Sequence, residues 1–289
     1  MKYIVSLMFS GLLMASSLIA QNSANNGYRM MNGVPVTSTS EDMITEISTK
    51  GLSVMESSMN DYSSAIWVRD IYREVYDVEG NESLFYPAVS TEKRANLFSL
   101  LINLLSDNTI KAYKFEDEPD FRESSALTAK EVMEQNKIGY TESNRRTLAV
   151  NREDVANLQI VGYLIKEKWF YDIKTGKGDV RVQALCPIVC ERGKQFPAFW
   201  VMFDDVSVYL QRAVSSLVAA NAPLPTNIPL FNLIRNRYYK GCIYRVGVRD
   251  LGKYFTTPES LAKERQRIES ELDYVQSRFD ALATAHQND

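Results

Sequence analysis

Apolar residues recur with two different periods along the chain, and the period separates predicted helices from predicted strands. Apolar pairs at 67–68, 71–72 and 75–76 recur every four residues, which predicts a helix over 67–76. The segment Leu84–Pro87 is expected to be extended, because the residue before a proline is pushed out of the helical region. A second helix is predicted after the N-cap Ser90, with one face made of Leu97, Leu100, Leu101, Leu104 and Leu105.

Strand-type residues dominate the region 160–203, which predicts an antiparallel β-meander. The expected strands cover 160–173, 180–184 and 199–203, separated by turns at 174–179 and 192–194. Gly176 and Gly178 precede a strand rather than a helix, so a hairpin turn is favoured over a phosphate-binding loop. A further strand is expected over 242–248.

Shorter helices are expected on both sides of the meander. They cover 128–135, 206–218 with Asp204 or Asp205 as the N-cap, and 230–239. The proline-rich segment 221–229 predicts a surface connector. The acidic run 116–120 lacks the residue order of an EF-hand, so a solvated loop is favoured over a calcium site.

The C-terminal segment carries a distinctive helical pattern. Thr257 can cap a helix, and Pro258 suits its first position. A seam with spacings of four and three then follows, made of Ile268, Leu272, Val275, Phe279 and Leu282. Because two heptads are short for an independent coiled coil, packing on its own domain is favoured, and contact with another subunit is the alternative.

The first 60 residues differ from the rest of the chain. Lys2 and the apolar run after it predict a secretory signal peptide over 1–20, with cleavage after Ala20 favoured over cleavage after Ser17. Residues 21–60 are polar and predict an arm or linker, for which a disordered tail is favoured over an arm ordered against a neighbour. A core over 61–256 and a C-terminal helix and tail over 257–289 complete the expected domains.

Charge and composition argue against several classes of function. Lys2 is the one charged residue of the signal, so the remainder carries 32 basic and 36 acidic side chains, which does not suit a general nucleic-acid binder. The only histidine, His286, lies close to the C-terminus, so a histidine triad or histidine-ligated zinc site is not expected. We therefore predict no catalytic, cofactor-binding or metal-ligating residues.

The cysteines add little to the expected fold. Their number is odd, so at least one of the three stays free or pairs with another chain. Cys186 and Cys190 in one strand lie too far apart to bridge, whereas pairing of either with Cys242 stays open, and free buried thiols are favoured. The whole pattern predicts an α+β fold, in which a small antiparallel β-meander packs with several helices, an extended N-terminal arm and a C-terminal amphipathic helix.

Several blocks share the order and spacing of the motifs of a known family. They are Trp67–Arg73, Leu84–Pro87, the leucine-rich helix followed by Ala112 and Tyr113, Ile165–Asp172, Val182–Val189, Phe199–Phe203 and Phe231–Tyr244. In these blocks the chain resembles the GldN/PorN family of the Bacteroidetes gliding-motility and type IX secretion machinery. The resemblance extends over about 65–280.

The resemblance implies a structural component rather than an enzyme. It implies a periplasmic protein associated with the outer membrane through a partner, in a ring made of copies of itself and a GldK/PorK-like outer-membrane lipoprotein. That ring is expected to contact the GldM/PorM-like periplasmic region of the inner-membrane motor, without a cofactor or nucleic acid. The alternative function is a stand-alone periplasmic binding module, for example for peptidoglycan.

Two sets of residues are possible partner contacts. Trp169 and Phe170 are adjacent in one predicted strand, so alternation sends them to opposite faces, one to the core and the other toward a helix or a partner. The second set lies on the C-terminal seam and comprises Ile268, Leu272, Val275 and Phe279.

Overall fold

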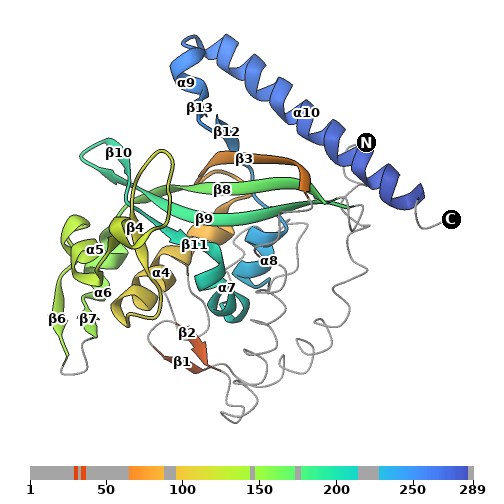
Figure 1. Ribbon diagram of the computed structural model, residues 1–289. Coiled ribbons are helices and arrows are strands. Elements are labelled where there is room, and N and C mark those ends of the chain that lie inside the picture. The colour runs from red at the N-terminus through yellow and green to blue at the C-terminus, as the bar shows by residue number, and fades with distance from the viewer. Residues whose placement is uncertain are drawn as a thin grey trace.

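The part of the chain that the computed structural model describes contains an antiparallel sheet and helices that pack against it (Figure 1). This part comprises residues 29–31, 34–36, 65–87, 96–143, 147–172, 177–213 and 228–285. The strands of the sheet are β3 (Ala65–Tyr76), β4 (Ala112–Lys114), β5 (Ala126–Leu127), β8 (Ile160–Asp172), β9 (Lys177–Glu191), β10 (Lys194–Pro197), β11 (Phe199–Met202), β12 (Cys242–Val246) and β13 (Arg249–Asp250). They follow the order β13-β12-β3-β8-β9-β11-β4-β5, and β10 pairs with β9.

Helices and two short hairpins complete the described elements and confirm the predicted α+β class. The helices are α3 (Glu82–Phe85), α4 (Leu97–Ser106), α5 (Ala129–Gln135), α6 (Arg152–Asn157), α7 (Phe203–Arg212), α8 (Leu230–Arg235), α9 (Leu251–Tyr254) and α10 (Pro258–Ala285), with a 3-10 turn, η3 (Glu123–Ser125). The hairpins join β1 (Arg29–Met31) to β2 (Val34–Val36) and β6 (Tyr140–Glu142) to β7 (Leu148–Val150). The predicted signal peptide and most of 21–60 and 221–229 lie outside the described residues.

The predicted meander is present as the strands β8, β9, β10 and β11. β8 and β9 pair along almost their whole length, with Ile160 opposite Val189 and Asp172 opposite Lys177. The turn into β10 contains Arg192 and Gly193 at positive φ, which suits a tight two-residue hairpin. The β-branched and aromatic residues of these segments therefore indicated the correct structure.

The helix predicted over 67–76 is wrong, because these residues form β3. This strand pairs with β8 on one side and with β12 on the other. Ile71, Tyr72 and Val75 are all buried, so both faces of the strand are covered. Strands covered on both faces lose the simple alternation of apolar and polar residues, and the apolar pairs of β3 then imitate a helical period.

Two predicted features on either side of α4 are also corrected. Leu84 and Phe85 belong to the helical turn α3, and the extended conformation begins only at Tyr86. The predicted cap Ser90 lies outside the described residues. Asn96 is the N-cap of α4, and its side chain accepts a hydrogen bond of 2.7 Å from the amide of Ser99.

The other predicted helices are present with changed limits. α5 covers nearly the whole predicted range 128–135, and Thr128, predicted as its first residue, is its N-cap in a capping box with Glu131. α7 begins at Phe203, so Asp204 and Asp205 lie in its first turn and neither is the N-cap. The predicted helix over 230–239 is the shorter α8, and the predicted strand over 242–248 ends two residues earlier as β12.

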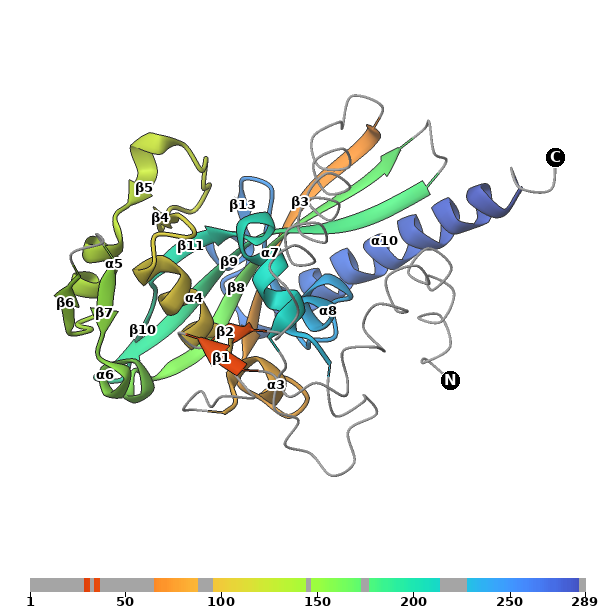
Figure 2. The ribbon, with the colours of Figure 1, turned by 90° about the horizontal axis from the view of Figure 1, so that it is seen from below.

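One face of the sheet holds the largest apolar core. There α4, α7 and α8 lie over β8 and β9 (Figure 2). Their side chains pack against Val75, Ile165 and Leu185. The five leucines predicted to form the apolar face of α4 are all at most 3% exposed.

The opposite face holds a smaller aromatic core. Trp200 lies there with Tyr72, and Phe115 stacks on Trp200 with ring centroids 6.2 Å apart. The acidic run that follows Phe115 is a loop, as predicted, but it is anchored. The buried Arg245 forms ion pairs with Asp117 and Glu118, at 3.4 and 2.9 Å.

The C-terminal helix α10 begins as predicted and lies partly on its own domain. The amide of Ser260 donates to the hydroxyl of Thr257 at 3.2 Å, which caps the helix. Ile268 and Leu272 are buried in an apolar cluster with Trp169. This part of α10 follows the favoured alternative, packing on its own domain.

All three cysteines are free. Cys186 is buried, Cys190 is half-buried and Cys242 is exposed. Burial raises the pKa of the Cys186 thiol far above its ordinary value. The three thiols do not pair within the chain, as favoured, but the expected burial is found only for Cys186.

Candidate functional site

A buried carboxylate on β8 collects the central polar contacts of the sheet. Glu167 is 0% exposed and accepts four hydrogen bonds. Its Oε2 accepts from Nε of Arg73 at 3.1 Å and from Nε1 of Trp169 at 2.9 Å. Its Oε1 accepts from Nε of Arg237 at 3.2 Å and from the hydroxyl of Tyr239 at 2.7 Å. Burying a charge is costly, and these partners compensate for the lost hydration. We call these five residues the Glu167 network.

The Glu167 network also ties α10 to the sheet. Arg73 donates through both terminal nitrogens to the carboxylate of Glu269 on α10. Four residues earlier on the same face of β3, Arg69 forms an ion pair of 2.7 Å with Glu271. Arg265 of α10 donates to a backbone carbonyl of β12 at 2.7 Å. Because these contacts are directional, they fix the position of the helix along its axis as well as its distance from the sheet.

Electrostatics keeps the members of this network in defined protonation states. Burial alone would raise the pKa of Glu167, but Arg237 and Arg73 outweigh it and hold the pKa below its ordinary value. Burial likewise opposes the charge of Arg73, but Glu167 and Glu269 raise its pKa. Burial and the neighbouring Glu167 raise the pKa of Tyr239 well above its ordinary value. The network is therefore a set of fixed charges that suits structure rather than proton transfer.

The residues of this network lie far apart in the sequence, and their meeting was not predicted. Arg73, Glu167 and Arg237 belong to three separate blocks that carry the family resemblance. A signal for a paired charge was available, although not for its partners, because the charged triplet of Lys166, Glu167 and Lys168 interrupts the apolar residues of one strand. A charged residue at such a position is usually paired when it is buried.

Most of the predicted contact residues are buried. Trp169 and Phe170 are 5% and 8% exposed. Trp169 packs with Ile268 and Leu272 of α10, which is the helix alternative of the expectation, and a partner contact of either residue stays a prediction. Ile268 and Leu272 are buried against the sheet, at 3% and 0%. Val275 is half-buried. The side chain of Phe279 lies outside the described residues, so its contact with a partner stays a prediction.

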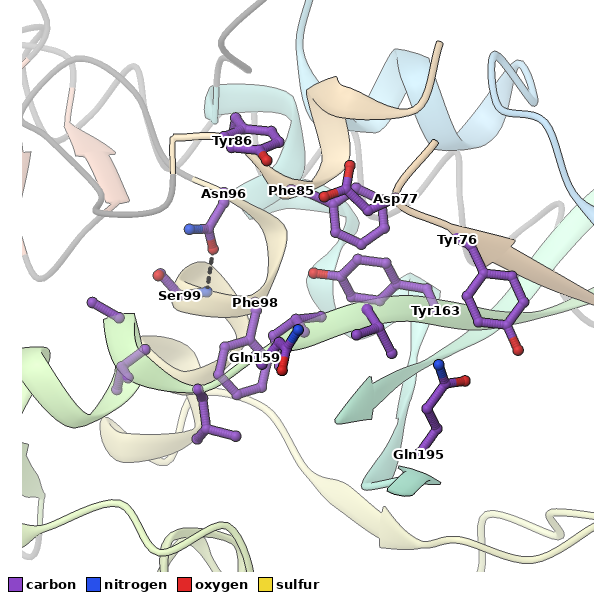
Figure 3. A pocket seen from close by; sticks show the side chains of 15 residues that line it. Tyr76, Asp77, Phe85, Tyr86, Asn96, Phe98, Ser99, Gln159, Tyr163 and Gln195 are labelled. Carbon is purple, nitrogen blue, oxygen red and sulfur yellow. Dashed lines mark hydrogen bonds between the residues drawn. The ribbon is translucent and has the colours of Figure 1, made fainter. Parts of the chain in front are cut away.

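A cleft of about 540 Å³ opens near the C-terminal end of β3 and the start of α4 (Figure 3). Aromatic rings and amide groups line it, including those of Tyr76, Phe85, Tyr86, Phe98, Tyr163, Asn96, Gln159 and Gln195. Among the described residues of the lining, Asp77 is the one carboxylate. Rings combined with amides suit a neutral polar ligand that stacks and accepts hydrogen bonds.

Two features are absent from the described residues. No three histidine, cysteine, aspartate or glutamate side chains gather as metal ligands within the described part of the chain. Of the helices in the described ranges, none combines the length and apolar character needed to span a membrane.

Comparison with known proteins adds the family. The chain has no match among the curated proteins. A family model described as gliding motility associated protein GldN matches residues 60–279. This range contains the whole Glu167 network and most of α10. Since the match covers more than half of its length, the chain belongs to the GldN family of gliding-motility proteins, whose role lies in gliding motility and type IX secretion.

Proposed function

We propose that the chain is a structural subunit of the periplasmic ring of the type IX secretion and gliding-motility machinery. The family match over residues 60–279 is the observation that carries this proposal. In the proposed ring, copies of the chain assemble with a GldK/PorK-like outer-membrane lipoprotein. The ring contacts the GldM/PorM-like periplasmic region of the inner-membrane motor.

The Glu167 network supports an architectural role. Its charges are buried and mutually neutralised, and a catalytic group would need a pKa near the working pH. Instead, Arg237 and Arg73 lower the pKa of Glu167, and Glu167 and Glu269 raise the pKa of Arg73. The network fixes α10 to the sheet, which gives an assembly subunit a rigid surface.

Native purification from the cell envelope tests the proposed function. The chain should co-purify with the lipoprotein as a large annular particle that is visible by electron microscopy. Deletion of the lipoprotein should release the chain to the soluble periplasm or lower its abundance. Retention of the chain in the outer-membrane fraction without the lipoprotein would contradict the proposal.

The cleft supports a second candidate, a periplasmic binding module for a neutral polar ligand such as a peptidoglycan glycan. Tyr86 contributes a ring that is 39% exposed, which suits stacking on a sugar. The test is retention of the purified chain on isolated cell wall, compared with the Tyr86→Ala and Gln159→Ala variants. Retention that both variants lose would favour this function, and absence of retention would exclude it for peptidoglycan.

A further inference from the structure

Two carboxylates lie at one end of the cleft described above without a cationic partner. Asp77 lines the cleft directly after β3, and Glu82 is the first residue of α3. Burial and the neighbouring Glu82 raise the pKa of Asp77, although the hydroxyl of Tyr86 donates to its carboxylate. Within the described residues neither carboxylate forms an ion pair, and the amine of Lys240 donates instead to the carbonyl of Glu79 at 2.9 Å. This end of the cleft therefore carries negative charge that no described side chain neutralises.

The inner wall of the cleft holds a buried hydroxyl whose proton lacks an acceptor. Tyr163 of β8 is 1% exposed, and its oxygen accepts a hydrogen bond from the amide of Phe98. A phenol can accept and donate at once, and no group in the described part of the chain accepts the proton of Tyr163. Figure 3 shows this hydroxyl directed toward the side of the cleft where Phe98 and Gln159 lie. Buried polar groups are nearly always hydrogen-bonded, so this donor marks a place where an oxygen of a ligand fits.

Aromatic rings connect the carboxylate end of the cleft to this hydroxyl. Tyr86, whose hydroxyl donates to Asp77, is followed inward by Phe85, and the rings of Phe85 and Tyr163 lie with centroids 5.3 Å apart (Figure 3). The faces of aromatic rings attract cations, and their carbon atoms pack on apolar stems. The lining therefore suits a molecule that carries a positive group at one end and a hydrogen-bond acceptor further in.

We propose that the cleft binds a primary amine carried by a neutral polar molecule. The ammonium group lies between the carboxylates of Asp77 and Glu82 and against the ring of Tyr86. A carbonyl or hydroxyl oxygen of the same molecule accepts the proton of Tyr163. An amino sugar and a short peptide with a lysine-like amine both present this chemistry. The inference rests on the second candidate function for the source of the ligand.

The lining favours an amine over the other ligands that carboxylates attract or repel. Calcium takes roughly six to eight oxygen ligands, whereas within the described residues no three candidate metal ligands gather. An anion would be repelled by Asp77 and Glu82, and the described residues of the lining include no lysine or arginine to offset that repulsion. An ammonium group needs only a few acceptors and is attracted by the rings as well.

Two matched pairs of soluble probes test the proposal with the purified chain. Glucosamine is compared with N-acetylglucosamine, and Nα-acetyl-lysine amide with Nα-acetyl-norleucine amide, because only the first member of each pair carries a free amine. In calorimetry at low ionic strength, the amine of at least one pair should bind at least tenfold more tightly than its neutral counterpart. The pair that shows this preference identifies the source of the ligand. Equal binding within both pairs, or no binding of either amine, overturns the inference.

A pair of carboxylate variants locates the bound amine. Asp77→Asn keeps the shape of the side chain and an acceptor for Tyr86 but removes the charge, so its affinity for the amine probe should fall at least tenfold. The control is Glu79→Gln, at an exposed carboxylate nearby that does not line the cleft, and it should bind the probe almost as the wild type does. Melting curves show that both variants are folded. Wild-type affinity of Asp77→Asn overturns the proposal.

Cations other than the proposed amine are tested in the same assay. Lys93 and Arg94 follow Pro87 closely in sequence and lie outside the described residues. The double variant Lys93→Gln/Arg94→Gln should bind the amine probe as the wild type does. A tenfold gain of affinity in this variant assigns the site to cations of the chain itself and overturns the inference. Displacement of the amine by micromolar Ca²⁺ also overturns it.

Retention on isolated cell wall separates this inference from the second candidate function. Selective binding of an amine by a chain that the wall does not retain supports the inference and excludes the second candidate function for peptidoglycan. Retention on the wall without binding of either amine overturns the inference alone. If the chain is neither retained nor binds an amine, both fail.

Discussion

The two ends of the helix-covered face are held together in different ways. At the end under α4, α7 and α8, which we call the apolar end, the packing is almost entirely apolar, and the rings of Phe203 and Phe231 stack with centroids 5.8 Å apart. At the end under α10, which we call the charged end, the apolar cluster is small and is built around Trp169 and Leu272. The Glu167 network lies beside that cluster and links it to β3 and α10.

The two ends contribute differently to the stability of the fold and to the position of α10. Apolar packing is non-directional and contributes free energy roughly in proportion to the area buried. Buried ion pairs add little net stability compared with apolar residues of the same shape, but breaking one is costly because it leaves a buried charge without a partner. We infer that the apolar end provides most of the stability of the fold, and that the charged end determines where α10 lies.

The largest expected effect comes from breaking the charged end. Glu167→Gln keeps the size of the side chain but leaves Arg73 and Arg237 without their charged partner. We expect a loss of about 3–5 kcal/mol in the free energy of unfolding, measured by chemical denaturation. The control is Glu123→Gln, at an exposed ion pair with Lys111, which should cost less than about 1 kcal/mol. Similar losses in the two variants would contradict the role of the Glu167 network.

The apolar end is tested by creating a cavity in it. Leu101 of α4 is 0% exposed, so Leu101→Ala should cost about 3 kcal/mol. Amide exchange in α10 should keep its wild-type pattern under native conditions, because no contact between α10 and the sheet is removed. Selective loss of protection in α10 would show that the two ends are not separable.

A smaller and local effect is expected at the contact between α10 and β3. Glu269→Ala removes the carboxylate that binds both terminal nitrogens of Arg73, whereas Glu167 remains as a partner. Because Glu269 is partly exposed, the cost should be about 1 kcal/mol. Limited proteolysis should cut α10 faster while the melting temperature changes little. An unchanged rate of cleavage in α10 would mean that this ion pair does not hold the helix.

Local patterns predicted those parts of the fold that depend on neighbouring residues. The leucine face of α4, the helix predicted over 128–135 and the Thr257 cap of α10 can each be read within a few residues. The meander could also be predicted, because its strand-type residues and its turns are close in sequence. Boundaries shifted by a few residues, since tertiary packing decides where a helix such as α7 begins.

The remaining features depend on residues that are distant in sequence. β3 was mistaken for a helix because its second covered face is created by the aromatic core around Trp200. Arg73 and Glu167 are separated by 94 positions, and no local pattern indicates that they meet. The seam of α10 was recognised, but only its burial shows that Ile268 and Leu272 face their own sheet.

The smallest effect distinguishes the two ends by their response to pH. Burial and the neighbouring Asp205 raise the pKa of Asp204, in the first turn of α7, to about 6. An aspartate of an unfolded chain titrates near pH 3.9, so between roughly pH 4 and 6 the folded state binds more protons. Stability from Asp204 is thus present in acid and lost as the pH rises through about 6. The lowered pKa of Glu167 has the opposite sign, because its contribution is lost as the pH falls.

Asp204→Asn should therefore raise the melting temperature by about 1–2 °C at pH 7.5, where the wild-type carboxylate is charged, and leave it nearly unchanged at pH 4.5. The small size follows from the partial exposure of Asp204, because solvent screens its charge. The exposed Asp273 of α10 offers the control Asp273→Asn, which should match the wild type at both pH values. Melting curves of the three proteins at the two pH values measure the effect. A gain for Asp204→Asn of the same size at pH 4.5 would show that packing, rather than the charge of Asp204, limits the apolar end.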